Sequence, residues 1–182
     1  MRNNTGTLTQ NSSLSQRRTV KWPAYAACAW AFLFAALSFF WAAGGRTGLH
    51  PLESQETSDS FLWVAVNLGA GMAKLVLGLI ALAFVQRRGS KIPHKLLLVV
   101  TWIVGVGMVL YGGLGLISDV LHVTGVINDP QSWKWFFLYL VLWDPWWVLG
   151  GALYIATALF SSRYQKFKNN SDKTKQVAAQ QP

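Results

Sequence analysis

Four long runs of apolar residues, separated by short polar segments, dominate the chain. They cover about residues 24–43, 61–85, 96–118 and 135–160. A helix needs roughly 20 apolar residues to cross the hydrocarbon core of a bilayer, and each run reaches that length. The pattern therefore predicts an all-α, polytopic membrane protein whose four transmembrane helices form one bundle.

The composition fits a membrane protein. Hydrophobic residues make up 52% of the chain and charged residues only 13%, whereas soluble domains carry about 25% charged residues. The net charge of +9 comes from short segments that flank the apolar runs, where Lys and Arg orient membrane helices. We therefore expect no nucleic-acid partner. The single cysteine, Cys28, provides no disulfide framework and no multi-cysteine metal site.

The basic residues gather before the first run, between the second and third runs, and after the fourth. The other two connections hold one basic residue each, Arg46 and Lys134, beside Glu53, Glu56, Asp59, Asp119 and Asp129. Because positive charge is retained on the cytoplasmic side, we expect both termini to be cytoplasmic. The polar segments 1–21 and 163–182 read as disordered basic tails around a transmembrane domain at 22–162.

Each run carries small residues at three- and four-residue steps, which place them on one helix face. Small residues let helices approach closely in lipid, so these faces predict the packing of the bundle. The sets are Cys28, Ala31, Ala35, Ser38 and Ala42; Asn67, Gly71, Lys74 and Gly78; Gly105, Met108, Gly112 and Gly115; and Asp144, Val148, Gly151 and Ala158.

The fourth run is interrupted by Asp144 and Pro145, a pair that is typical of a helix start. Two interpretations follow. A kinked but continuous helix places Asp144 below the outer surface, near the depth of Lys74, and we favour this interpretation. A broken helix starts the span at Pro145 and leaves Asp144 as a cap near the outer interface.

Lys74 lies near the middle of the second run, where an unpaired charge costs roughly 2.5–3.5 kcal/mol. Asp144 is the only acid inside another apolar run, so the sequence predicts an intramembrane Lys74–Asp144 pair, with Asn67 one or two turns above Lys74. We favour a structural pair that holds two helices in register. The alternative is an element that responds to protons or ions.

The first outer loop is a second candidate site. Gly44 and Gly45 permit a tight backbone path, and Arg46 is suited to clasp a carboxylate or a headgroup phosphate. His50 follows in the same loop. The acidic residues Glu53, Glu56 and Asp59, with Asp119 and His122, match no metal signature, and we favour a solvated rim over a divalent-cation site.

No pattern in the chain indicates a cofactor or a catalytic residue. The histidines His50, His94 and His122 fall at or beyond the ends of the runs, which does not favour a haem site inside a bundle. Phosphate-binding loops, nucleotide fingerprints and paired cysteines are lacking in the sequence.

Two segments carry a resemblance to a known family. The stretch from Phe39 to Leu49, with its Trp-Ala-Ala-Gly-Gly motif, resembles the first span and loop of a bacterial family of small four-span membrane proteins, classified only as a domain of unknown function. The segment from Trp143 to Trp146, followed by Gly150 and Gly151, resembles that family's last span. The likeness covers roughly residues 24–160, although the third run is richer in glycine than the family leads us to expect. It implies an integral protein of the bacterial cytoplasmic membrane and no particular activity.

We therefore expect a non-enzymatic accessory or interaction protein, in contact with the lipid bilayer and with a second copy or another membrane protein. The first alternative is a small oligomeric transporter or channel coupled to ions or protons. The second is a membrane-embedded enzyme with Arg46, His50 and Asp144 under the first outer loop.

Overall fold

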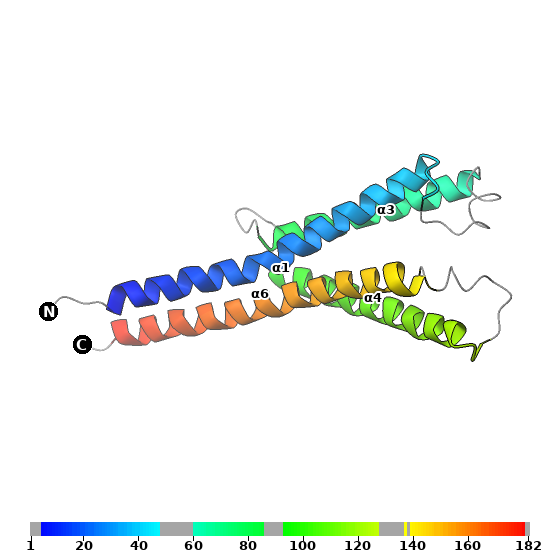
Figure 1. Ribbon diagram of the computed structural model, residues 1–182. Coiled ribbons are helices and arrows are strands. Elements are labelled where there is room, and N and C mark those ends of the chain that lie inside the picture. Colours follow the sequence, from blue (N-terminus) through cyan, green and yellow to red (C-terminus); the bar gives the residue numbers. More distant parts are fainter. Residues whose placement is uncertain (1–4, 48–59, 86–92, 128–136, 138, 181–182) are drawn as a thin grey trace.

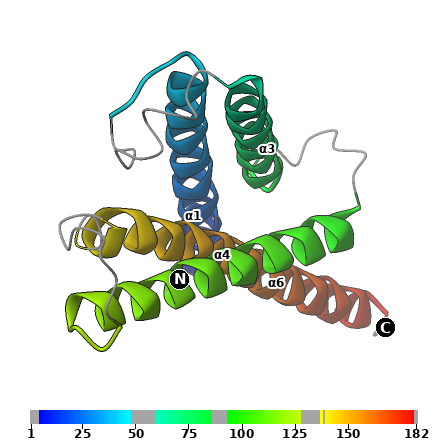
Figure 2. The ribbon, with the colours of Figure 1, turned by 90° about the vertical axis from the view of Figure 1, so that its right-hand side faces the viewer.

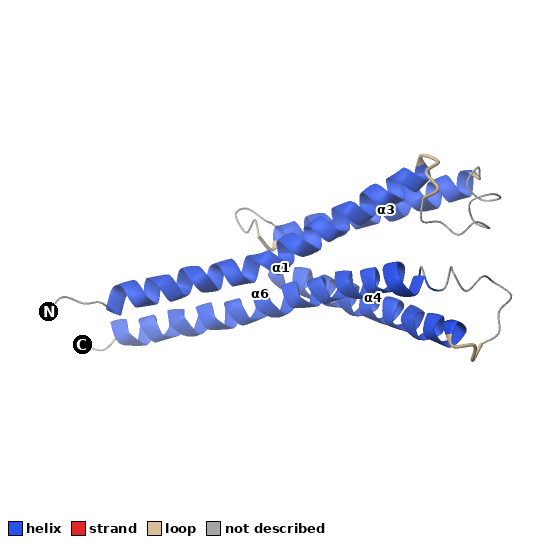
Figure 3. Ribbon diagram, in the orientation of Figure 1, coloured by secondary structure: helices blue, strands red, loops and turns tan. Residues whose placement is uncertain are grey.

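The structure is a computed structural model that describes residues 5–47, 60–85, 93–127, 137 and 139–180 (Figure 1). Over these residues all regular structure is helical and no strand occurs, which confirms the all-α class (Figure 3). The elements are α1 (Thr5–Ala42), α3 (Phe61–Ala83), α4 (His94–Val123), the π-helix η1 (Tyr139–Trp143) and α6 (Asp144–Ala179).

Three helical segments of the described chain are long and apolar enough to cross a membrane. They are Lys21–Ala42, Phe61–Ala83 and His94–Val123, and α6 adds a fourth long helix. The first two agree with the predicted runs to within three residues. The third helix continues five residues beyond the predicted end at Ser118, and this extension includes Asp119.

The helices are arranged as two antiparallel pairs. α1 packs along α3, α4 packs along α6, and the two pairs meet through α1 and α6, whereas α3 and α4 touch only slightly. The pairs diverge toward the ends that carry Ala42 and Val123, while both chain termini lie at the opposite end (Figures 1 and 2). The arrangement therefore differs from the single compact bundle that we expected, because close packing is confined to three helix contacts.

Both terminal segments continue as helix where we expected disorder. α1 begins at Thr5, and α6 continues to Ala179. Nucleation is the costly step of helix formation, so an existing helix extends into an adjacent polar segment at little further cost. Thr174 adds a local bond, because its hydroxyl donates to the carbonyl oxygen of Asn170 at 3.0 Å.

The chain remains helical from Tyr139 through Asp144 into α6, as in the kinked-helix interpretation. The last turn before Asp144 is the π-helix η1. Pro145 has no N–H group, and its ring would clash with the carbonyl four residues earlier in a regular α-helix. A wider π turn at this point relieves that clash. Asp144 is the first residue of α6 and Trp143 is its N-cap, so Asp144 does not hold the capping position of the alternative, broken-helix interpretation.

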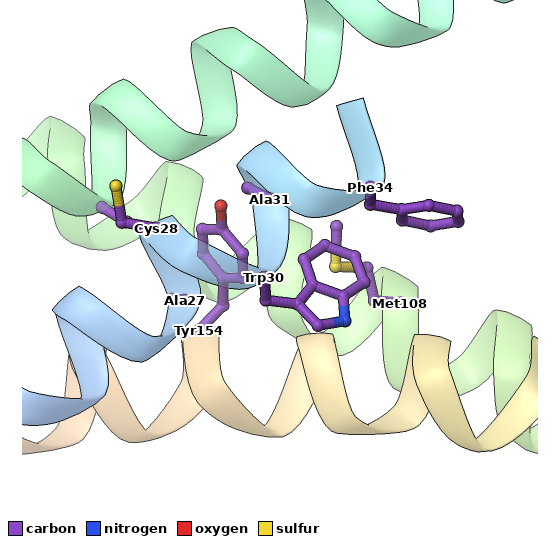
Figure 4. Close-up of a cluster of buried hydrophobic side chains, with 8 residues drawn as sticks. Ala27, Cys28, Trp30, Ala31, Phe34, Met108 and Tyr154 are labelled. Atoms are coloured by element: carbon purple, nitrogen blue, oxygen red, sulfur yellow. The ribbon is translucent and has the colours of Figure 1, made fainter. Parts of the chain in front are cut away.

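The main core cluster lies where α1 crosses α6. Tyr154 of α6 is fully buried and lies between Cys28 and Trp30 of α1, while Met108 joins from α4 (Figure 4). Most residues of the predicted small-residue faces are buried: Ala31 and Ala35 on α1, for example, are 0% exposed.

Candidate functional site

An aromatic seam joins α1 to α6 and frames the polar groups of the molecule. The indole nitrogen of Trp30 donates a hydrogen bond to the carbonyl oxygen of Trp146 at 3.0 Å. Gly150 makes this approach possible, because a Cβ atom there would overlap the Trp30 ring. The missing side chain at Gly150 thus lets a large ring lie directly on the backbone of α6.

The seam continues toward the open end of the two pairs. Phe34 packs edge-on against Trp147, with ring centroids 4.9 Å apart, and stacks on Trp143 at 6.2 Å. Trp41 reaches the other side of Trp143 at 5.3 Å. Such aromatic pairs contribute about 0.5–1.5 kcal/mol each beyond their buried area, so this seam is a substantial part of the contact between α1 and α6.

Lys74 of α3 directs its ammonium group into the seam. Its Nζ donates to the hydroxyl oxygen of Ser38 on α1 at 2.7 Å and lies 3.8 Å from the centroid of the Phe34 ring. The ring of Trp147 is farther away, at 5.9 Å. A cation over an aromatic face is attracted by the ring quadrupole, so the ammonium is held by a hydroxyl and by π electrons.

The contact with Ser38 also fixes the level of Lys74 along the molecule. Lys74 is thirteen residues from the start of α3 at Phe61, whereas Ser38 is only four residues from the end of α1 at Ala42. At 1.5 Å per residue, the ammonium lies about 6 Å from the end of α1. The first turns of α3 therefore extend beyond α1, and Lys74 lies close to the end of α1 although it is near the middle of α3.

The second polar group of the seam is a pair of carboxyl groups, Asp119 of α4 and Asp144 of α6. Their side chains are hydrogen-bonded to each other. Asp119 is 9% exposed and Asp144 is 6% exposed. The Oδ2 atom of each is buried and has no hydrogen-bond partner within the described residues.

Two glycines of α4 make room for Asp144. A Cβ atom at Gly115 would lie 2.5 Å from Oδ1 of Asp144, and one at Gly112 would lie 2.7 Å from its backbone oxygen. Gly112, Gly115 and Asp119 follow one another at three- and four-residue steps, so they share the face of α4 that meets α6. The glycines thus position the carboxyl of Asp144 beside that of Asp119.

The geometry of the Asp119–Asp144 pair requires a proton. An ionised carboxylate only accepts hydrogen bonds, so two carboxyl groups can bond to each other only when one of them is protonated. Two ionised carboxylates about 4 Å apart would repel by about 4 kcal/mol at an effective dielectric constant near 20. The hydrogen-bonded pair therefore holds at least one proton.

The structure does not bring the predicted partners Lys74 and Asp144 together. Within the described residues Lys74 bonds to Ser38, Asp144 bonds to Asp119, and no ion pair joins the two. Trp147 lies one turn after Asp144 and faces the ammonium instead. Asn67 is buried, and its Nδ2 donates to the carbonyl oxygen of Trp63 at 3.0 Å in its own helix.

Only part of the predicted outer-loop site falls within the described residues. Gly44 adopts a φ of +92°, which glycine tolerates best, and Gly45 lies against the ring of Phe40. The Trp41 indole donates to the carbonyl oxygen of Thr47 at 3.0 Å and closes the turn, while Arg46 is exposed. His50, Glu53, Glu56 and Asp59 lie outside the described residues. Among those that are described, no group of three His, Cys, Asp or Glu side chains is arranged to hold a metal ion.

The sequence placed Asp119 in a solvated outer rim, but its side chain is buried. Its position beside Asp144 was missed, because the third run was expected to end at Ser118. A signal was nevertheless present. The face that contains Gly105, Met108, Gly112 and Gly115 continues with the same spacing to Asp119.

The fold is that of an all-helical protein with three segments long and apolar enough to span a membrane, and with buried polar groups along one seam. Its sequence matches the model of a family described as "Protein of unknown function (DUF3995)" over residues 31–154, and the chain belongs to this family. No curated protein and no solved structure matches the chain.

Proposed function

We propose that the protein is a multi-pass protein of the bacterial cytoplasmic membrane that acts through contacts with lipid and with another transmembrane helix, and not by catalysis. The observation that carries the proposal is a set of glycines on the outward faces of α3 and α4. Gly69 and Gly107 are exposed, and a Cβ atom at either position would meet no other atom within 4 Å. Glycine costs a helix interior about 1 kcal/mol relative to alanine, so glycines without an internal contact support an external one.

The surroundings of Gly107 suit a helix better than lipid chains alone. Ile103 and Tyr111 lie one turn on either side of it and are 68% and 65% exposed. A small residue between two large apolar ones forms a depression on the helix surface, and small residues are enriched where transmembrane helices meet. We place the partner helix here, supplied by a second copy of the chain or by another membrane protein.

The proposal includes the orientation of the molecule. The two termini lie at the same end, as an even number of crossings requires (Figure 1). Lys21 and Arg163 lie on the terminal side of the apolar parts of α1 and α6, and Lys95 is the second residue of α4, which supports a cytoplasmic location for this side. In this arrangement α6 is the fourth span.

Photo-crosslinking in intact membranes tests the partner. A photoreactive amino acid at Ile103 is expected to yield a discrete protein adduct, and Gly107→Leu, which fills the depression, is expected to abolish it. Two differently tagged copies in one cell distinguish a second copy from a different protein. The same label at Asn170, an exposed residue of the α6 tail, serves as the matched control. Adducts with lipid alone at Ile103, unaffected by Gly107→Leu, would contradict the proposal.

A second candidate function, proton- or ion-coupled transport, is favoured by the Asp119–Asp144 pair. Buried carboxyls with unpartnered oxygens are costly, and ionisable groups inside membrane helices often mark a pathway for ions. Purified protein in liposomes, with pH-gradient and ion-gradient readouts, provides the test. Flux that is present in the wild type and lost in Asp144→Asn would favour this function over the first.

A further inference from the structure

The Asp119–Asp144 pair links one end of α4 to the start of α6. Asp119 lies four residues before the end of α4 at Val123, and Asp144 is the first residue of α6. The hydrogen bond between the two carboxyls crosses the helix contact. Their other oxygens have no hydrogen-bond donor among the described residues, so the shared proton is the polar link between them.

We infer that this pair is a proton-operated latch. One bound proton holds the end of α4 against the start of α6, and release of that proton lets the two helix ends separate. The latch goes beyond a role in helix contacts, because it gives the molecule a way to respond to pH. It does not depend on which partner the protein meets.

The direction of the response follows from counting protons. The closed state holds one proton between the carboxyls, whereas an open state exposes both to water, where an aspartate is ionised at neutral pH. The state that binds more protons is favoured as the pH falls. Acid therefore closes the latch, and rising pH opens it.

The ionisable groups around the pair come from three elements. On α4, His122 lies close enough for its charge to act on Asp119, and its Nδ1 donates to the carbonyl oxygen of Ser118 at 2.8 Å. On η1, Tyr139 packs beside Trp143. On α3, the ammonium group of Lys74 lies 5.9 Å from the ring of Trp147, which is one turn after Asp144. The charge of His122 favours the ionised form of Asp119 and so acts against the latch.

The test measures the distance between the two helix ends as a function of pH. The full chain, with Cys28→Ala, receives spin labels at Val123→Cys on α4 and Val141→Cys on η1. Both valines are exposed, at 41% and 59%. In lipid nanodiscs the label-to-label distance is expected to lengthen with rising pH through one single-proton transition.

Asparagine variants identify the groups responsible. In Asp144→Asn or Asp119→Asn the amide N–H group donates to the remaining carboxylate without any proton from solution. Both variants are therefore expected to lose the transition and keep the short distance at every pH. His122→Gln is expected to keep the transition, because His122 is not part of the hydrogen-bonded pair. Asp172→Asn, a change of an exposed acid on the α6 tail, is expected to keep the wild-type response.

Four outcomes of the distance measurement would overturn the latch: a wild-type distance that does not change with pH, a transition that persists in both asparagine variants, its loss in His122→Gln, or the loss of response in Asp172→Asn. Infrared spectroscopy of the wild type gives a readout that needs no folded variant. A carboxylic-acid C=O band at neutral pH that disappears in step with the distance change supports the latch, and its absence at neutral pH overturns it. A lack of ion flux in liposomes would contradict a transport function without contradicting the latch. The two proposals can therefore be disproved separately.

Discussion

The ammonium group of Lys74 donates to the hydroxyl of Ser38 at 2.7 Å, across the contact between α3 and α1. We predict that Ser38→Ala lowers the stability of the protein in detergent, because the charge loses a hydrogen-bond acceptor. The same change in a Lys74→Met background should cost less. A double-mutant cycle on thermal unfolding is expected to give a coupling of about 0.5–1.5 kcal/mol. A coupling of zero would show that the hydrogen bond is not formed.

Lys74 and Asp144 should behave differently from that pair. They bond to different residues, so we predict that the costs of Lys74→Met and Asp144→Asn add to within about 0.5 kcal/mol in the double variant. The measurement is the same unfolding cycle. A double variant that recovers most of either loss would show that the two side chains meet, as the sequence alone had suggested.

Two adjacent glycines of α4 offer a matched comparison. A Cβ atom at Gly112 would lie 2.7 Å from the backbone oxygen of Asp144, whereas one at Gly113 would meet nothing within 4 Å. Gly112→Ala is therefore expected to force α4 and α6 apart and to cost about 1–3 kcal/mol. Gly113→Ala should be neutral or stabilising by up to about 1 kcal/mol, because alanine is the better helix former. Equal effects in thermal unfolding would count against the close approach of the two helices.

Gly150 and Trp30 make a second such test on the other side of α6. Gly150→Ala is expected to displace the Trp30 ring and to lower stability by about 1–3 kcal/mol. In a Trp30→Ala background the same change should cost much less, since the ring is gone. Gly113→Ala on α4, which meets nothing within 4 Å, is the control. Strictly additive losses for Gly150 and Trp30 would contradict the contact.

The orientation is tested by labelling single cysteines in intact cells, in a Cys28→Ala background. A cysteine at Ser54, between α1 and α3, is expected to react with a reagent that cannot cross the membrane. A cysteine at Ser171, on the α6 tail, should react only after the cells are permeabilised. The reverse pattern would place the termini outside the cell.

The spacing of residues along the chain predicted the buried faces of the helices better than it predicted the contacts of the candidate site. Helix periodicity depends on residues a few positions apart, so the buried faces with Ala31, Gly71 and Gly105 could be predicted from the chain alone. Which faces meet depends on how each helix is rotated and shifted against the next, and that information is not local. The sequence therefore predicted that Lys74 pairs with Asp144, the only other charged residue inside an apolar run. In the structure Lys74 bonds to Ser38, and Asp144 bonds to Asp119.

The level of Lys74 relative to α1 could not be predicted for the same reason. Lys74 lies near the middle of its own helix, as expected, but its contact with Ser38 is close to the end of α1. α3 starts beyond the end of α1, so the level of Lys74 is set by the offset between two helices and not by its position in one.

The unbroken length of α6 has a mechanical consequence. Its 36 residues make a rod about 54 Å long, in contact with Trp30 at Gly150. Measured from that contact, Asp144 is about 9 Å away and Ala179 is about 43 Å away on the opposite side. A straight rod that tilts about Gly150 moves its far end roughly five times as far as its near end. A movement of one ångström at Asp144 would thus displace the basic end of the chain by about 5 Å, so α6 works as a lever whose short arm carries the acid and whose long arm carries the lysines.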